Sequence, residues 1–184
     1  GTKVPIGAAG ATARIDASRQ LWRFPVDVKA KDLMAFKADA DGVSGDLYLF
    51  LSLLDAQGEI IWKDIQDYGS DNFDFWIYYT PAADETLTMQ VQADHTYSFD
   101  PGIFTTRAYV ADWLDLGVAG NRVTLKTGDQ FPIQAVTAQF SADPDAVPRQ
   151  LTAAQLVFAS TDPLVATVDA AVIGNHEFDL GGQN

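Results

Sequence analysis

The chain has 184 residues, enough for one large domain or two small ones, and 47% of them are hydrophobic. Its 25 acidic and 12 basic residues give a formal net charge of −13, which repels nucleic-acid phosphates and anionic lipid headgroups, so we expect neither as a partner. Cysteine is absent and no apolar stretch approaches membrane-spanning length, which excludes disulfides and thiolate sites and leaves membrane insertion unexpected.

The first part of the chain reads as a leader followed by strands. Residues 1–13 are small and weakly patterned, and indicate a leader or linker. Leu21–Val28 alternates apolar and polar residues as a half-buried strand does, and Pro25 within it predicts an edge strand or a bulge. Leu47–Leu54 is almost continuously apolar, which is typical of a central strand, and the turn Asp55–Gly58 predicts a hairpin to Glu59–Lys63.

Strand patterns continue to the end of the chain, with turn residues about every ten positions. Asp112–Gly120 is the exception, since it can form a single helical turn. The further strands that the pattern predicts are Phe73–Tyr79, Thr86–Ala93, Thr105–Trp113, Val123–Asp129, Phe131–Phe140, Leu156–Ala159 and Val165–Asp169. Short strands at this spacing are the signature of a sandwich, so we predict an all-β fold, an antiparallel β-sandwich or jelly roll.

Four stretches in the first half form a further pattern. They are the first strand Trp22–Val28, the strand Gly45–Leu49, the turn Asp55–Gly58, and the turn Pro81–Asp84 leading into a last strand. With them, residues 21 to about 93 resemble the bacterial pre-peptidase C-terminal jelly roll, an accessory module of secreted proteins. Thr86–Met89 departs from the usual ending of that module, a small-residue turn before Tyr and two aliphatics. The resemblance implies a non-catalytic jelly roll.

The second half carries a different likeness. Through Thr127–Phe131 and Leu156–Asp169, residues 123–169 resemble a bacterial immunoglobulin-like repeat of surface proteins, which also implies a non-catalytic spacer or binding module. We therefore expect a leader or linker over 1–13, a jelly-roll-like sandwich over 14–119 and a small immunoglobulin-like sandwich over 120–184. One continuous domain is the alternative division.

The acidic turn Asp39–Asp46, just before the predicted central strand, is a candidate calcium site. Calcium binds six to eight oxygens, and closely spaced Asp and Gly residues supply carboxylates on a chain able to fold around the ion. Asp39, Asp41 and Asp46 would be the side-chain ligands. The turn has no closing Glu, and a solvated hairpin turn is the plainer interpretation.

Aromatic residues crowd positions 62–79 together with Asp and Asn. Sugars stack their C–H faces on exposed rings while carboxylates and amides bind their hydroxyls, so this mixture is typical of a carbohydrate site. The predicted ligand-binding residues are Trp62, Trp76, Tyr78, Asp71 and Asn72. Strand alternation places Trp76 and Tyr78 on one face and Ile77 on the other. The alternative is that these rings belong to the sandwich core.

A short segment near the end of the chain carries the other hypothesis. Gly174-Asn175-His176-Glu177 resembles the metal-binding segment of calcineurin-like phosphoesterases and 5′-nucleotidases, in which Asn175 and His176 would match a metal ligand and a transition-state stabiliser. A two-metal hydrolase needs a cage of several such ligands, and His95 is the only other histidine. A turn followed by an ordinary strand is the plainer interpretation.

These observations favour a non-catalytic binding module over an enzyme. The composition, rich in small and acidic residues with two Met and no Cys, is typical of an exported bacterial protein, so we expect a secreted, periplasmic or cell-surface location. The predicted function is binding of a glycan or a protein partner, with a structural calcium ion. The alternative is a fragment of a metal-dependent phosphoesterase that carries the segment at residues 174–177.

Overall fold

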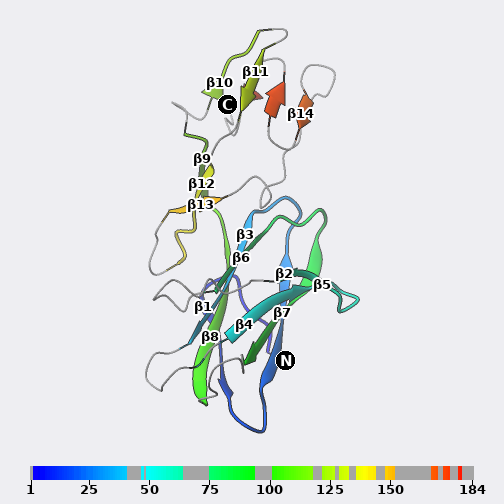
Figure 1. Cartoon of the computed structure of the whole chain (residues 1–184), viewed down its shortest axis with the longest axis vertical. Helices are drawn as coiled ribbons and strands as arrows, with labels where there is room; N and C mark the ends of the chain where they lie inside the picture. The colour runs from blue at the N-terminus through cyan, green and yellow to red at the C-terminus, as the bar shows by residue number, and fades with distance from the viewer. Residues whose placement is uncertain are drawn as a thin grey trace. The chain divides into compact units, whose positions relative to one another are not determined.

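The computed structural model describes residues 2–40, 47, 49–63, 75–93, 101–117, 122–126, 129–132, 136–143, 148–151, 167–169, 172–174 and 178–179 (Figure 1). Every secondary-structure element within these ranges is a β-strand, which confirms the all-β prediction. None of the described residues forms a helix of the length and apolarity that crossing a membrane requires. The chain divides into two compact units, Gly1–Val110 with Ala142–Pro144, and Ala111–Ser141 with Asp145–Asn184.

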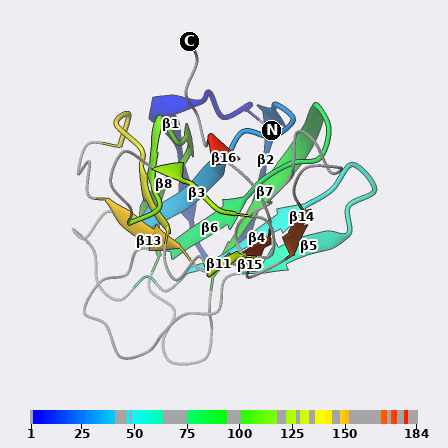
Figure 2. The ribbon, with the colours of Figure 1, turned by 90° about the horizontal axis from the view of Figure 1, so that it is seen from above.

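The first unit is an antiparallel jelly roll. Two four-stranded sheets, ordered β1-β8-β3-β6 and β2-β7-β4-β5, lie face to face, and this strand order is that of a jelly roll (Figure 2). The strands are β1 (Gly7–Ile15), β2 (Leu21–Val28), β3 (Met34–Ala40), β4 (Leu49–Leu54), β5 (Ile60–Lys63), β6 (Phe75–Tyr79), β7 (Glu85–Ala93) and β8 (Gly102–Val110). The predicted central strand is β4, which pairs with both β5 and β7.

Alternating apolar residues of both sheets fill the space between them. Every second side chain of β3, β4 and β7 points inward, and the largest fully buried ones include Phe36, Leu51 and Met89. Ile77 of β6 joins this core, as its alternation predicted. Because the interior is packed with side chains, polar and aromatic groups available to a ligand lie on the outer faces of the two sheets or in the loops.

The two N-terminal strands lie at sheet edges. β2 is an edge strand, the first of the two alternatives that Pro25 predicted, and the carbonyl of Pro25 accepts a hydrogen bond from the Val4 amide at 2.9 Å. A residue of an antiparallel strand directs its N–H and C=O to the same side, so the N–H that proline lacks would face this edge and not β7.

The predicted leader at residues 1–13 is corrected by the structure, because Gly7–Ile15 forms β1 and pairs with β8. Its Gly and Ala residues carry no apolar alternation, yet their backbone groups complete the sheet. A bulge at Gly10, whose φ of +59° suits glycine, accommodates the strand.

The second unit contains three small antiparallel sheets, ordered β13-β12-β9, β11-β15-β14 and β10-β16. Its strands are β9 (Trp113–Asp115), β10 (Arg122–Val123), β11 (Gln130–Pro132), β12 (Val136–Gln139), β13 (Arg149–Leu151), β14 (Thr167–Asp169), β15 (Val172–Gly174) and β16 (Phe178–Asp179). The helical turn predicted within Asp112–Gly120 is wrong over its described first half, where β9 pairs with β12. Because of that pairing the units divide after Val110, earlier than the predicted boundary at 119.

Candidate functional site

The outer face of the sheet β1-β8-β3-β6 gathers charged and aromatic side chains. Lys37 on β3 lies directly opposite Trp76 on one neighbouring strand and Arg107 on the other. Residues directly opposite in a sheet share a face, and so do residues two positions apart on one strand. The charged-aromatic face of the jelly roll is defined by Lys37, Asp39, Trp76, Tyr78, Arg107 and Tyr109.

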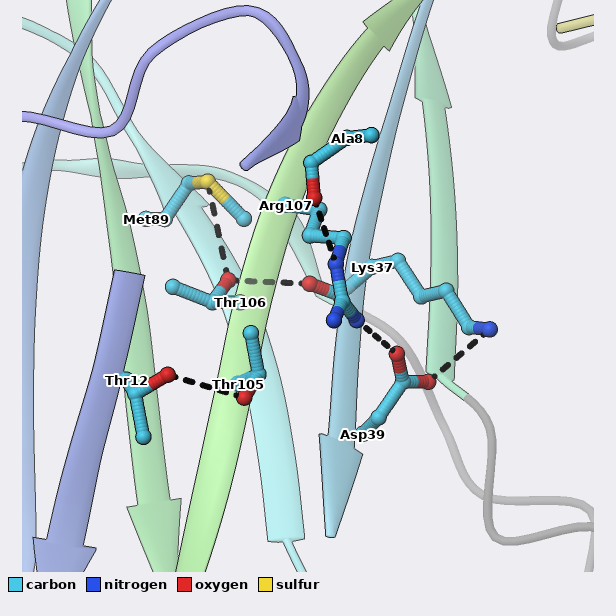
Figure 3. Close-up of polar contacts among 8 residues, drawn as sticks. All are labelled: Ala8, Thr12, Lys37, Asp39, Met89, Thr105, Thr106 and Arg107. Atoms are coloured by element: carbon cyan, nitrogen blue, oxygen red, sulfur yellow. Dashed lines mark hydrogen bonds and ion pairs between the residues drawn. The ribbon is translucent and has the colours of Figure 1, made fainter. Parts of the chain in front are cut away.

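One carboxylate joins the two cations of this face. The Asp39 oxygens lie 3.0 Å from the Lys37 ammonium and 2.7 Å from Nη1 of Arg107 (Figure 3). Arg107 is fixed further by a hydrogen bond from its Nε to the carbonyl of Ala8 at 3.2 Å. Lys37 is only 5% exposed, so its charge depends on this ion pair far more than a surface lysine would.

Three rings form a strip on the same face. The rings of Trp76 and Tyr78 are stacked with centroids 6.1 Å apart and planes 10° apart, and those of Trp76 and Tyr109 are 6.0 Å and 28° apart. The Lys37 ammonium lies 5.1 Å from the Trp76 ring centroid, within cation–π range. Tyr109 is 0% exposed and Tyr78 is 8% exposed, whereas Trp76 is half-buried. Trp76 is therefore the least buried ring of this strip.

The structure separates two rings that the sequence assigned to one platform. Trp62 lies on β5 in the sheet β2-β7-β4-β5, where it is opposite Leu53 of β4, and it packs against the core. Trp76 lies on the charged-aromatic face and not with Trp62. Asp71 and Asn72, the polar partners predicted for both rings, are outside the described residues. The predicted binding role of these residues stays a prediction, with Trp76 as its accessible aromatic member.

The predicted calcium ligands are described only in part. Asp39 is the second-to-last residue of β3, and its carboxylate already has the two cationic partners described above. Asp41 and Asp46 lie outside the described residues. Among the residues that are described, no three His, Cys, Asp or Glu side chains gather as a metal site would require. Calcium at this turn stays a prediction, and Lys37 and Arg107 compete with it for Asp39.

The phosphoesterase-like segment begins at the end of a strand. Gly174 is the last residue of β15 and lies opposite Gln130 of β11 and Thr167 of β14. Asn175, His176 and Glu177 are outside the described residues, as is His95. The role proposed for this segment therefore stays a prediction.

The sequence did not predict a shallow hollow on the outer face of the other sheet. This hollow has a volume of about 400 Å³ and is open to solvent. Arg23 of β2, Thr86 and Thr88 of β7, and Leu54 of β4 line it, together with the turn Asp55–Gly58. We call the outer face of the sheet β2-β7-β4-β5 the open face.

Hydrogen bonds hold the side chains of the open face in place. Nε of Arg23 donates to Oε1 of Gln90 at 2.9 Å, across the pair that these residues form between β2 and β7. The Thr86 hydroxyl donates to Asp27 at 2.8 Å, and Asp27 is also ion-paired with Lys3. The hydrogen bond from Lys3 is the largest of the effects that lower the pKa of the Asp27 carboxyl below its ordinary value.

The turn at the rim of the hollow is the hairpin that the sequence predicted between β4 and β5. Oδ1 of Asp55 accepts hydrogen bonds from the amides of Gln57 and Glu59, each at 2.9 Å. Gly58 has a φ of +84°, a conformation that glycine adopts without strain. Alternation alone placed Thr86 and Thr88 on one strand face, but only the pairing of β2 with β7 brings Arg23 beside them.

No protein-family model and no curated protein matches the sequence. Among solved structures, the chain is similar to the pre-peptidase C-terminal domain of collagenase from Bacillus anthracis, with a TM-score of 0.45 and 4% sequence identity. The match covers 58% of this chain and 92% of that domain. The module is the one that residues 21 to about 93 resemble in sequence. At this identity the likeness concerns the fold only, and no functional residue is carried over from it.

Proposed function

We propose that the chain is a non-catalytic binding module of a secreted, periplasmic or cell-surface protein, and that its jelly-roll unit binds a glycan on the charged-aromatic face. The observation that carries the proposal is the half-buried Trp76 ring, stacked in a strip with Tyr78 and Tyr109 beside fixed charged groups. A protein partner is the alternative occupant of this face.

The chemistry of the face suits a sugar. The Tyr78 ring stacks on the Trp76 ring and holds it in place, and the C–H face of a sugar ring can stack on the part of the Trp76 ring that stays exposed. The adjacent ion pair between Asp39 and Arg107 offers acceptors and donors for hydroxyl groups. A net charge of −13 disfavours polyanionic ligands, so a neutral glycan is the expected class.

The packing of the jelly roll supports a binding role over catalysis. Its interior is filled by the side chains of two sheets, so a ligand can bind only at the outer faces or in the loops. Most catalytic strategies need a site that excludes water and holds reacting groups in a low-dielectric setting. Stacking on a half-buried ring requires neither condition.

Affinity electrophoresis of the full chain tests this proposal. Gels containing soluble neutral polysaccharides, such as hydroxyethylcellulose, xyloglucan and galactomannan, should retard the wild-type chain. Trp76→Ala should weaken that retardation about tenfold, since a stacking anchor contributes roughly 1–3 kcal/mol. The matched control is Ile103→Ala, which removes another apolar side chain from the same outer face, 41% exposed, and should leave binding unchanged. Equal retardation of wild type and Trp76→Ala would contradict the proposal.

A structural calcium ion at Asp39, Asp41 and Asp46 is the second part of this proposal. Because an ion that binds only the folded chain stabilises it by mass action, millimolar calcium should raise the melting temperature relative to chelator. Asp41→Ala should remove the rise without disturbing the ion pairs of Asp39. A melting curve that is the same with calcium and with chelator would end this part of the proposal and leave the glycan site standing.

A further inference from the structure

We infer that the open face carries a second saccharide site, in the hollow between Arg23 and the turn Asp55–Gly58, that binds one or two rings of a neutral sugar. The hollow lies on the sheet opposite the charged-aromatic face, and none of its lining residues belongs to that face. The inference therefore goes beyond the glycan site proposed above and does not depend on it.

The shape of the hollow suits a small ligand. Its volume of about 400 Å³ falls in the lower part of the range of small-molecule sites, roughly 300–1,000 Å³. The lining residues that carry aliphatic groups are Leu54, Ala56, Thr86 and Thr88. Arg23 and the Asp55–Gly58 turn supply its polar groups. A sugar ring, with apolar C–H faces and a polar rim, presents the same division of surface.

Hydrogen-bond donors in the hollow are fixed but not all used. Arg23 is held through Nε by Gln90, and among the described residues its two terminal nitrogens have no partner. The Thr88 hydroxyl likewise has no hydrogen-bond partner in the described part of the chain. The Thr86 hydroxyl gives its hydrogen to Asp27, so its oxygen is left to accept a hydrogen bond.

The charges of the hollow identify the class of ligand. Arg23 contributes one positive charge and Asp55 one negative charge, so the lining as a whole is neutral. An anion would meet Asp55 and a net charge of −13, and a cation would meet Arg23. Hydroxyl groups both donate and accept, so a neutral polyhydroxylated ligand can satisfy the guanidinium, the threonines and the carboxylate together.

The lining is also preorganised. Arg23, Thr86 and Thr88 project from paired strands, and Asp55 is fixed by two backbone amides of its own turn. Ordering a lining on binding costs affinity, so side chains that are already held favour a ligand with few strong contacts. This matters for a shallow hollow, which buries little area.

Titration of the ¹⁵N-labelled full chain with sugars, followed by NMR, tests the inference. The chain carries Trp76→Ala, which removes the stacking ring of the charged-aromatic face. The probes are glucose, galactose, mannose, xylose, cellobiose and maltose. We expect saturable shifts of the Gln57, Gly58 and Thr88 amides with at least one probe. Thr88→Val keeps the shape and strand preference of the residue and should weaken that binding about three- to tenfold, the effect of one lost hydrogen bond. Arg23→Leu should weaken it further.

Matched controls on the other sheet are Thr12→Val and Arg14→Leu, which change the same residue types without touching the hollow and should leave the titration unaltered. Absence of shifts at the hollow with every probe would overturn the inference, as would shifts that persist unchanged in Thr88→Val and Arg23→Leu. Wild-type shifts confined to Trp76 and its neighbours would refute the second site and support the first. Shifts at the hollow that Trp76→Ala leaves intact would support the second site, whether or not the charged-aromatic face binds a glycan.

Discussion

Strand alternation builds both outer faces of the jelly roll, but the ion pair on one face is buried and the ion pair on the other is exposed. On the charged-aromatic face Lys37 is almost fully buried and is paired with Asp39. On the open face the ion pair between Lys3 and Asp27 has both side chains 55% exposed. One ion pair holds a buried cation in place, whereas water can replace the other. Similar residue types therefore form a buried ion pair on one face and an exposed ion pair on the other.

Removing one carboxylate from each face should give the largest difference in stability between the two faces. Asp39→Ala removes a carboxylate that pairs with the buried Lys37 ammonium, and should lower the free energy of unfolding by about 3–5 kcal/mol. Asp27→Ala removes a pair exposed to water and should cost far less stability. Urea unfolding of both variants measures the difference. Equal losses would show that burial does not distinguish the two faces.

Alanine substitution of two glycines, one beside each outer face, compares the backbone packing of the two sheets. A Cβ added at Gly10 would lie 2.7 Å from both Cγ of Arg107 and the carbonyl oxygen of Thr106, while one at Gly58 would meet nothing within 4 Å. Both glycines have positive φ, so Gly58→Ala reports conformational strain alone, about 1–2 kcal/mol. Gly10→Ala adds a clash and should cost roughly 1–3 kcal/mol more. A Gly10→Ala variant no less stable than Gly58→Ala would argue against the close approach of β1 to β8.

The smallest expected effect is on the loss of folding stability at acidic pH. The hydrogen bond from Lys3 keeps the folded-state pKa of Asp27 below its ordinary value of 3.8. Its contribution to stability is therefore present above the unfolded pKa and is lost as pH falls through the lower folded pKa. Asp27→Asn should flatten the fall of the urea midpoint below about pH 4 by a small amount, because the group is exposed. Lys3→Met should flatten it likewise, and an unchanged slope in both variants would rule out this contribution.

Local patterns predicted most of the jelly roll because they act through neighbours in sequence. Within the predicted apolar run, Leu49–Leu54 forms the inner strand β4, and the Asp-x-x-Gly turn after it forms the expected hairpin. The alternation around Ile77 separated its core face from the face of Trp76. Where the pattern was weak, as in the Gly- and Ala-rich β1, the strand was missed, since its partner is some 90 residues away along the chain.

The candidate sites were harder to predict because each depends on pairing across strands. Trp62 and Trp76 are close in sequence, yet β5 and β6 belong to different sheets, so the rings do not form one surface. Arg23 and Thr88 are far apart in sequence, yet the register between β2 and β7 places them on one face of one sheet. The positions of aromatic and acidic residues in the sequence do not predict that register.

By itself, the sequence determined the all-β class, the hairpin at Asp55–Gly58 and the exclusion of thiol chemistry, because each follows from composition or from short-range alternation and turn preference. It also limited Pro25 to an edge strand or a bulge. Only the tertiary structure decided which outer face buries its ion pair and which leaves it exposed to water. That choice depends on strand order and register, and these are fixed by packing between segments far apart in the chain.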